Sequence, residues 1–222
     1  MTKKLAIMQP YFLPYIGYWQ LINTVDEFII YDDVNYISRG YVNRNYINTK
    51  TGKQRITLKL KKASINKHIN EIETLGDVED VIKTIHHTYR KSKYYEPTIS
   101  VVEETIRNSE TNLALYLKSQ IVSICKFIGI DTSISLSSDM KNDKHQRGQH
   151  KILDMCKLKN VTQYINPIGG TSLYDKDYFA KNNIVLNFLK CDSSLNMMSI
   201  IDLLFTQGVD NTRKYLTRYA LV

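Results

Sequence analysis

Residues 5–33 read LAIMQPYFLPYIGYWQLINTVDEFIIYDD, and this stretch decides the fold. It begins with the apolar run Leu5 to Met8, and a second apolar run spans Phe28 to Tyr31. Short continuous apolar runs of this kind are typical of buried strands. Between them, Tyr18 to Ile22 predicts the first turns of a helix. A strand, a helix and a strand in this order form a βαβ unit, which implies a parallel sheet.

The rest of the chain continues this alternation. We expect strands over 54–60, 134–136, 162–165 and 184–188, and helices over 80–90, 113–128, 151–158, 177–181 and 199–205. Asn112 suits the cap of the helix over 113–128, and Gly129 suits its end. The sequence therefore predicts an α/β fold: a mostly parallel sheet with flanking helices, a Rossmann-like core and a mainly helical segment over 76–130. We expect one domain over 1–222.

Composition restricts the class of protein. Hydrophobic residues make up 43% of the chain, enough for a substantial core, yet no apolar run approaches the roughly 20 residues that span a bilayer. The N-terminus lacks the features of a secretory signal, so we expect a cytoplasmic protein. The three distant cysteines, Cys125, Cys156 and Cys191, predict neither a disulfide framework nor a metal site, and we expect reduced, mostly buried thiols.

The net charge is +8, and much of it lies in the segment from Lys50 to Lys67, with more at Arg90, Lys91 and Lys93. A basic balance favours an acidic partner, which can be nucleic acid, anionic lipid or a phosphorylated small molecule. A solvated basic face accounts for the charge equally well. Nucleic acid is the least favoured partner, because no nucleic-acid-binding motif accompanies the charge.

Several expected strands end in polar or glycine-containing loops. In open parallel sheets, ligands bind outside the carboxyl ends of the strands, where the strand order changes direction. We therefore expect one crevice built from Gln9-Pro10-Tyr11, Asp32-Asp33, Ser137-Ser138 and Asn166 to Gly170.

The first of these loops leads into a run rich in tyrosine, with Tyr11, Tyr15 and Tyr18. Aromatic rings with hydroxyls suit a sugar or a nucleobase, and the helix that follows offers free N–H groups to a phosphate. A rigid turn whose rings fill the core is an equal alternative.

The pair Asp32-Asp33 can take a cation, bind sugar hydroxyls or supply a general base, or it can be a solvated turn. Only one of the two needs to face the crevice, because side chains alternate along an extended segment.

Three further groups are candidates for binding or chemistry. Arg39 and Arg44 can clamp phosphate or carboxylate, or form surface salt bridges. His150 lies four residues before Asp154, so a helix that begins early enough gives a histidine oriented by a carboxylate. Cys156 more often packs in a core than acts as a nucleophile. Gly169-Gly170 can form an anion-binding turn but lacks the lysine and the spacing of a P-loop.

Taken together, these segments resemble the WbqC-like protein family. The resemblance rests on five stretches that follow one another along most of the chain: Gln9 to Leu21, Tyr31 to Tyr36, Arg39 to Asn45, Tyr164 to Tyr174 and Ser199 to Gly208. The sequence departs from the family at Leu13, where phenylalanine is frequent, at Asn35, where glutamine is common, and at Asn166-Pro167, where Ser-Gly is more usual. The last departure concerns the shape of the loop before the glycine pair.

The resemblance implies a bacterial enzyme that makes or decorates an O-antigen or capsule sugar. The expected reaction transfers a small acyl or aminoacyl group, such as glycyl, from an activated acyl or carrier-protein donor to a nucleotide-linked amino sugar. Asp32, Asp33 or His150 would be the catalytic base. The residues expected to bind substrate are Gln9, Tyr11, Tyr15, Tyr18, Arg39, Arg44, Asn45, Ser138, Gly169, Gly170 and Tyr174. A non-catalytic sugar-nucleotide or partner-binding module is an alternative.

A second similarity concerns the fold. The N-terminal unit is similar to that of the nucleotidyltransferase superfamily that includes pantothenate synthetase. In that superfamily a His-x-Gly-His motif opens the first helix, and Tyr15-Ile16-Gly17-Tyr18 stands at that place here. Ser137-Ser138 is similar to its later phosphate-contacting segment. The similarity implies a nucleotidyltransferase-like core and a bound nucleotide, ATP or a sugar nucleotide, with adenylyl transfer altered or absent because both histidines are replaced.

Overall fold

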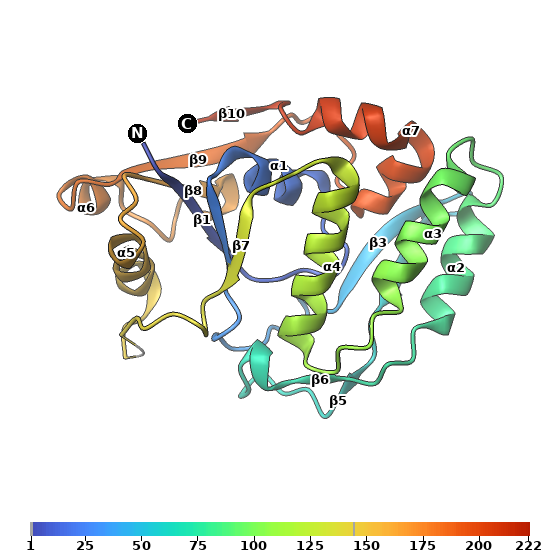
Figure 1. Cartoon of the computed structure of the whole chain (residues 1–222), viewed down its shortest axis with the longest axis horizontal. Helices are drawn as coiled ribbons and strands as arrows, with labels where there is room; N and C mark the ends of the chain where they lie inside the picture. Colours follow the sequence, from blue (N-terminus) through green and yellow to red (C-terminus); the bar gives the residue numbers. More distant parts are fainter. Residues whose placement is uncertain (1, 144) are drawn as a thin grey trace.

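The central sheet of the computed structural model, which describes residues 2–143 and 145–222, has the strand order β10-β9-β8-β1-β2-β7 (Figure 1). Its parallel strands are β1 (Lys4–Met8), β2 (Glu27–Ile30), β7 (Ser133–Leu136), β8 (Gln163–Pro167) and β9 (Val185–Cys191), and β10 (Tyr219–Leu221) runs antiparallel to β9. The chain first extends the sheet from β1 through β2 to β7 and then returns to the other side of β1 with β8. The predicted α/β fold with a mostly parallel sheet is confirmed, and its strand order changes direction between β1 and β8.

Helices and two small antiparallel sheets surround this sheet. The helices are α1 (Ile16–Thr24), α2 (Glu79–Tyr89), α3 (Tyr95–Ile106), α4 (Leu113–Ile128), α5 (Gly148–Leu158), α6 (Lys176–Ala180) and α7 (Ile200–Tyr215). The small sheets pair β3 (Arg44–Thr49) with β4 (Gly52–Thr57), and β5 (Leu60–Lys61) with β6 (Glu73–Thr74). Single 3-10 turns are η1 (Ile69–Glu71) and η2 (Ile168–Gly170). Residues 76–130 are mainly helical, as expected, because they hold α2, α3 and α4.

The structure differs from the sequence expectation in several elements, and the short strands β6 and β10 are among those that were not expected. Helix α3 was not expected, and its Pro97 is tolerated because the first turn of a helix needs no N–H donor there. No strand was expected at β3, whose first two residues, Arg44 and Asn45, were assigned to an arginine clamp. The strand expected over 54–60 divides into β4 and β5. Helix α7 continues ten residues past Phe205, through a kink at Gly208 where φ is 78°.

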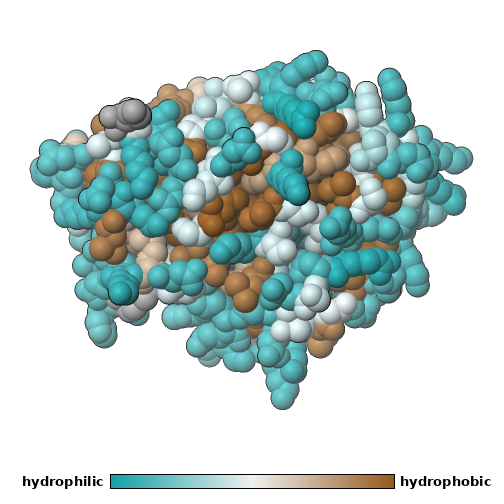
Figure 2. Space-filling model, in the orientation of Figure 1, coloured by the Kyte–Doolittle hydropathy of each residue, from teal (hydrophilic) through white to brown (hydrophobic). Residues whose placement is uncertain are grey.

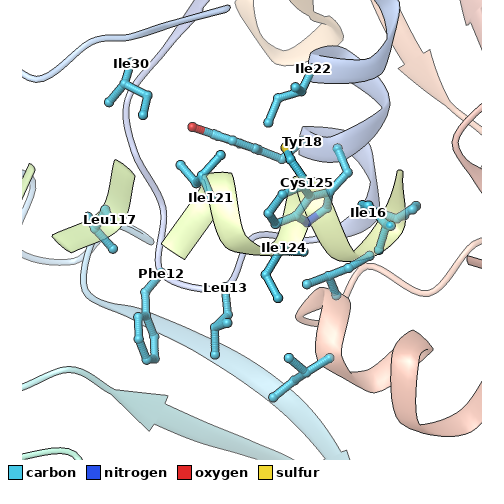
Figure 3. Packing of buried hydrophobic residues seen from close by; sticks show 14 of the residues in the cluster. Phe12, Leu13, Ile16, Tyr18, Ile22, Ile30, Leu117, Ile121, Ile124 and Cys125 are labelled. Carbon is cyan, nitrogen blue, oxygen red and sulfur yellow. The ribbon is translucent and has the colours of Figure 1, made fainter. Parts of the chain in front are cut away.

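Helices α1 and α4 pack together against the sheet and form much of the core. Figure 3 shows the ring of Tyr18 lying among Ile22 of its own helix and Ile121 and Cys125 of α4. The ends of α4 are as expected: the Asn112 side chain accepts hydrogen bonds from two backbone N–H groups, and Gly129 ends the helix in the left-handed conformation. The capping residues read from the sequence therefore mark the same helix α4 that packs in the core.

The outer face of α4 is partly apolar. Figure 2 shows hydrophobic side chains reaching the surface over α4 and beside it, and Leu115 and Val122 are 41% and 45% exposed. None of the helices in the described part of the chain is both long enough and apolar enough to cross a lipid bilayer.

Candidate functional site

A pocket of about 710 Å³ opens beyond the carboxyl ends of β2 and β7, beside the N-terminus of α5. Pockets of this size hold nucleotide-sized ligands. Its wall includes Tyr31, Asp33, His68, Ser138, Arg147, Lys151 and Tyr174. The crevice was expected at the carboxyl ends of the parallel strands, and this pocket lies there. Of the four loops that we expected to form the crevice, those after β2 and β7 line this pocket, whereas Gln9 and the glycine pair do not.

An ion pair closes the inner end of the pocket. The Nζ atom of Lys151 lies 3.0 Å from Oδ2 of Asp33 and donates a hydrogen bond of 3.2 Å to the Asp33 backbone carbonyl. The two side chains are only 5% and 10% exposed. Such a pair is costly to desolvate, and each charge depends on the other. Sequence reasoning missed Lys151, although a lysine directly before the buried run Ile152-Leu153 is an unusual place for a charge.

Tyr31 forms the wall beside this pair. Its ring lies 5.0 Å from the Lys151 Nζ atom, a cation–π contact. Burial, and then the negative charge of Asp33, raise the pKa of the Tyr31 hydroxyl above its usual value, while the positive charge of Arg147 acts in the opposite sense. The phenol is therefore protonated at neutral pH and can donate a hydrogen bond to a ligand.

Asp32 has a different role from its neighbour. Its side chain is fully buried, and its Oδ1 accepts hydrogen bonds from the Ser138 N–H at 2.9 Å and the Ser137 hydroxyl at 3.0 Å. Its Oδ2 accepts from the Ser138 hydroxyl at 2.7 Å. The Asp32 carboxylate thus ties the end of β2 to the end of β7. As expected from the alternation of side chains, only Asp33 of the two faces the pocket.

A segment far along the chain supplies another wall. Residues 67–70 run beside residues 32–36, through backbone hydrogen bonds from Tyr36 to Lys67 and from Ile69 to Val34. This pairing brings His68 and Asn70 into the pocket. Neither residue was expected there, because nothing local in the sequence marks a pairing between segments some thirty residues apart. The basic segment from Lys50 to Lys67 therefore ends at this pocket.

The tyrosine-rich loop is anchored in the core. Leu13 has a positive φ of 46°, and its N–H donates to the buried Gln120 side chain at 2.8 Å. Its carbonyl accepts from Asn45 Nδ2 at 2.6 Å and from the Ser199 hydroxyl at 2.8 Å. Asn45 is 3% exposed, so its amide holds the loop and does not line the pocket.

The tyrosines of this loop lie apart from the Asp33 pocket. The Tyr18 ring is fully buried, and its hydroxyl donates to the Gln9 carbonyl at 3.1 Å. The half-buried Tyr11 ring lies 5.7 Å from Tyr18 and 5.8 Å from Tyr41. Burial, and then the charges of nearby side chains, raise the pKa of Tyr15 to about 12. The structure thus favours the alternative in which the Tyr18 ring fills the core.

The two arginines of the expected clamp do not converge on the pocket. Arg39 is exposed on the loop before β3. Arg44 begins β3, and its guanidinium donates to the Ser38 carbonyl at 2.6 Å. The arginine that lines the pocket is Arg147, at the N-cap position of α5. Beside it, Gly148 has a positive φ of 54° and lines the pocket as well. A guanidinium next to a helix N-terminus attracts anions.

His150 lies in α5 but lines a neighbouring pocket of about 420 Å³ together with Arg147 and Asp154. Its Nδ1 atom lies 2.7 Å from the Tyr178 hydroxyl. The Asp154 carboxylate accepts a hydrogen bond from the Asp143 N–H. The structure therefore does not bring His150 together with Asp33. Cys156, on the same helix, is fully buried, which agrees with a packing role.

The glycine pair shapes the wall that carries Tyr174. A Cβ atom on Gly170 would lie 2.1 Å from Oδ1 of Asn166 and 3.2 Å from the Tyr174 ring, so any larger residue would displace the Asn166 side chain. Gly169 is exposed with open space around it. The Asn166 side chain in turn donates to the hydroxyl of the buried Tyr164 at 2.7 Å. The loop after β8 therefore supports Tyr174 through packing, and only Tyr174 reaches the pocket.

Metal-ligating side chains are sparse in the site. Within residues 2–143 and 145–222, no three His, Cys, Asp or Glu side chains gather closely enough to hold a metal ion. Groups that can hold an anionic cofactor or substrate are concentrated at Arg147 and at the start of α5.

Comparisons with known proteins bear on this site. The model of the WbqC-like protein family matches residues 9–214, which include Asp33, Arg147, Lys151 and Tyr174. The chain is also similar to the uncharacterized Mycobacterium tuberculosis protein Rv1507c, with 30% identity over 94% of this chain and 95% of that protein. No solved structure matches the chain significantly. The match over residues 9–214, most of the chain, shows that the chain belongs to the WbqC-like protein family.

Proposed function

We propose that this protein is a transferase of bacterial surface-polysaccharide biosynthesis, which passes a small acyl or aminoacyl group to the amine of a nucleotide-linked amino sugar. The observation that carries the proposal is the buried Asp33–Lys151 pair, which lies in one pocket with Arg147 and the N-terminus of α5. A carboxylate can accept a proton from the sugar amine, and a guanidinium beside a helix N-terminus can bind the diphosphate.

The reaction assigns a role to each group. The sugar amine attacks the carbonyl carbon of the activated donor, a C–N bond forms, and the bond to the leaving group breaks. The amine proton passes to the Asp33 carboxylate, which acts as the general base. Lys151 orients this carboxylate, and the Tyr31 phenol is a donor for the oxygen that gains negative charge. Arg147 holds the diphosphate, and Tyr174 lies against the sugar.

The test is a transfer assay with an amino-sugar nucleotide and a panel of activated acyl and aminoacyl donors. We expect a new amide, detected by mass spectrometry, and a loss of turnover of at least about a hundredfold in Asp33→Asn, as for removal of a general base. Asp139→Asn is the matched control, since Asp139 is two residues after Ser137 and does not line the pocket. Absence of any amide across the panel would refute the proposal.

The sequence also allowed His150 as the catalytic base, and a variant of His150 distinguishes this alternative from Asp33. Because His150 lines the neighbouring pocket, His150→Gln should retain turnover within about threefold, the change expected of a residue that takes no part in proton transfer. Loss of turnover in His150→Gln with normal turnover in Asp33→Asn would move the chemistry to the neighbouring pocket.

A nucleotidyltransferase-like activity is the second candidate, and the strand order favours it. The order β7-β2-β1-β8-β9 with a change of direction at β1 is the doubly wound arrangement that binds nucleotides. The replacement of both motif histidines by Tyr15 and the buried Tyr18 speaks against adenylyl transfer. Calorimetric titration with ATP, with and without magnesium, tests this candidate, and the absence of heat would exclude it.

A binding module without catalysis is the third candidate, favoured by the stable anchoring of the site by Asp32. A binding module would keep its affinity for the sugar nucleotide in Asp33→Asn and would form no amide with any donor. An enzyme would lose turnover in the same variant while it keeps its fold, which circular dichroism checks.

A further inference from the structure

Another pocket, of about 730 Å³, lies at the opposite end of the molecule from α5, between the β3–β4 hairpin and the loop after α2 (Figure 1). The hairpin contributes Asn48, Thr49, Lys50 and Gln54, and the end of α2 contributes His87, Arg90 and Lys91. No residue of this pocket lines the Asp33 pocket. The two pockets are therefore separate sites.

The charges around this pocket have one sign. Lys50, Arg90 and Lys91 lie on its wall, and none of its lining residues is Asp or Glu. All three cations are exposed. Like charges gathered around a concave surface repel one another, and a bound anion relieves this repulsion.

Some surface cations in the described part of the chain have acidic partners, and others, such as Lys53 and Arg55, form no ion pair. Lys59 pairs with two aspartates, Lys61 pairs with Glu73, and Arg218 pairs with Asp192. Within the same described residues, Lys50, Arg90 and Lys91 form no ion pair. These three unpaired cations thus gather in a pocket where the fold supplies no carboxylate.

The floor of the pocket is held in place from below. The carboxylate of the buried Asp202 accepts hydrogen bonds from the Asn48 N–H at 3.1 Å and the Tyr89 hydroxyl at 2.6 Å. Burial, and then the Asp202 charge, raise the pKa of Tyr89 far above its usual range, so this phenol stays a donor. Asp202 carries one negative charge behind the floor, and the three cations at the rim outnumber it.

We infer that this pocket binds a phosphorylated small molecule of nucleotide size that carries two or more negative charges. Its volume is within the range of about 300–1,000 Å³ found for small-molecule sites. Arginine and lysine supply the donors and charges that phosphate oxygens require. A concave pocket with three cations on its wall fits a compact ligand better than an extended nucleic-acid strand, which requires a basic stripe.

Calorimetric titration of the full chain with inorganic pyrophosphate and with uridine diphosphate tests this inference. Because Arg147 is a proposed phosphate ligand of the other pocket, all titrations use the Arg147→Gln background. We expect binding at low salt that weakens as salt rises. Lys50→Gln, Arg90→Gln and Lys91→Gln should each lower the affinity about tenfold, as for one lost charge-assisted hydrogen bond.

Lys53→Gln is the matched control, because Lys53 is exposed on β4 next to Gln54 and does not line the pocket. It should change the affinity less than about twofold, as for a screened surface charge that does not touch the ligand. No heat with either ligand would overturn the inference. Equal losses in Lys53→Gln and Lys50→Gln would also overturn it, as would a single-stranded oligonucleotide that binds more tightly than uridine diphosphate, because these results indicate a diffuse nucleic-acid surface.

Discussion

The ammonium group of Lys151 lies 3.0 Å from Oδ2 of Asp33, and both side chains are almost completely buried at the inner end of a pocket. Lys151 comes from α5 and Asp33 from the end of β2, so the pair joins two elements through residues that are 118 positions apart. The Ser137 hydroxyl oxygen lies 2.5 Å from Oδ1 of Asp33 and 3.0 Å from Oδ1 of Asp32, so its single proton is shared between the two carboxylates. The pair therefore fixes the position of α5, and of Arg147 at its start, relative to the sheet.

Breaking this pair on one side should destabilise the protein strongly. Lys151→Met leaves the buried Asp33 carboxylate without its cation, and we expect a loss of about 3–5 kcal/mol in the free energy of unfolding. Asp33→Asn should cost less, because the new amide oxygen and the unchanged backbone carbonyl at this position still accept hydrogen bonds from Lys151. Urea denaturation with tryptophan fluorescence measures both, since Trp19 is buried in the core.

The double variant Asp33→Asn/Lys151→Met tests whether the effect belongs to the pair. Removing both charges leaves no buried ion, so the double variant should be more stable than the sum of the single losses predicts, with a coupling above about 1 kcal/mol. The exposed pair of Lys61 and Glu73 is the control, with 58% and 53% of the side chains exposed, and it should show little coupling. Additive losses at Asp33 and Lys151 would show that the two side chains do not interact in solution.

The βαβ unit could be predicted because its signals are local. The apolar runs of β1 and β2 have no polar interruption, and both strands are almost fully buried. Asn112 and Gly129 mark the ends of α4 by their own hydrogen bonding and conformation. The helix over 199–205 was predicted, but the second helical segment of α7 was not: it follows the non-helical backbone of Gly208, against which the Tyr94 ring packs.

The site could be predicted only in part. The rule for parallel sheets located the pocket at the strand ends, and the alternation of side chains placed one of two aspartates in it. His68 enters through a pairing with residues 32–36 that no local pattern marks. Arg44 and Asn45 were assigned to ligand binding, whereas they begin β3 and Asn45 holds the loop of Leu13. Polar residues that anchor a loop and polar residues that bind a ligand have the same composition, and only the fold distinguishes them.

The glycine pair offers a test of the wall that carries Tyr174. In Gly170→Ala the new methyl group would lie 2.1 Å from Oδ1 of Asn166, so Asn166 must rotate away from the buried Tyr164 hydroxyl. We expect a loss of about 1–3 kcal/mol in the free energy of unfolding, typical of overpacking. Gly169→Ala is the control, because nothing lies within 4 Å of its Cβ position, and its stability should be nearly unchanged. Equal stability of the two variants would contradict the close contact at Gly170.

The thiols should react in an order set by burial. Burial raises the pKa of Cys125 and of Cys156 to about 12, and both side chains are inaccessible. Burial also raises the pKa of Cys191, but this residue is only half-buried at the end of β9. Iodoacetamide at a mildly alkaline pH should therefore modify Cys191 first, which peptide mass spectrometry detects. Urea should make all three react. Rapid labelling of Cys156 in the folded protein would show that α5 opens readily.

Glu27 should make stability depend on acid pH. It lies at the start of β2, where the ammonium groups of Lys159 and Lys3 form ion pairs with its carboxylate. Burial by itself raises the pKa of Glu27, but the hydrogen bonds and charges of the two lysines outweigh this effect and lower the pKa below its usual value. A carboxyl group whose pKa is lower in the folded state stabilises the protein above its unfolded pKa, and this contribution is lost as the pH falls through the folded pKa.

Glu27→Gln isolates this contribution from those of other acids. The unfolding free energies of both proteins are measured by urea denaturation at neutral pH and in steps below the usual glutamate pKa of 4.5. At neutral pH the variant should be less stable, because Lys159 and Lys3 lose their carboxylate. As the pH falls, the difference between the two proteins should shrink, since the protonated Glu27 side chain and the glutamine that replaces it are both uncharged. A difference that stays constant over the whole range would show that Glu27 stabilises the fold by packing and not by its charge.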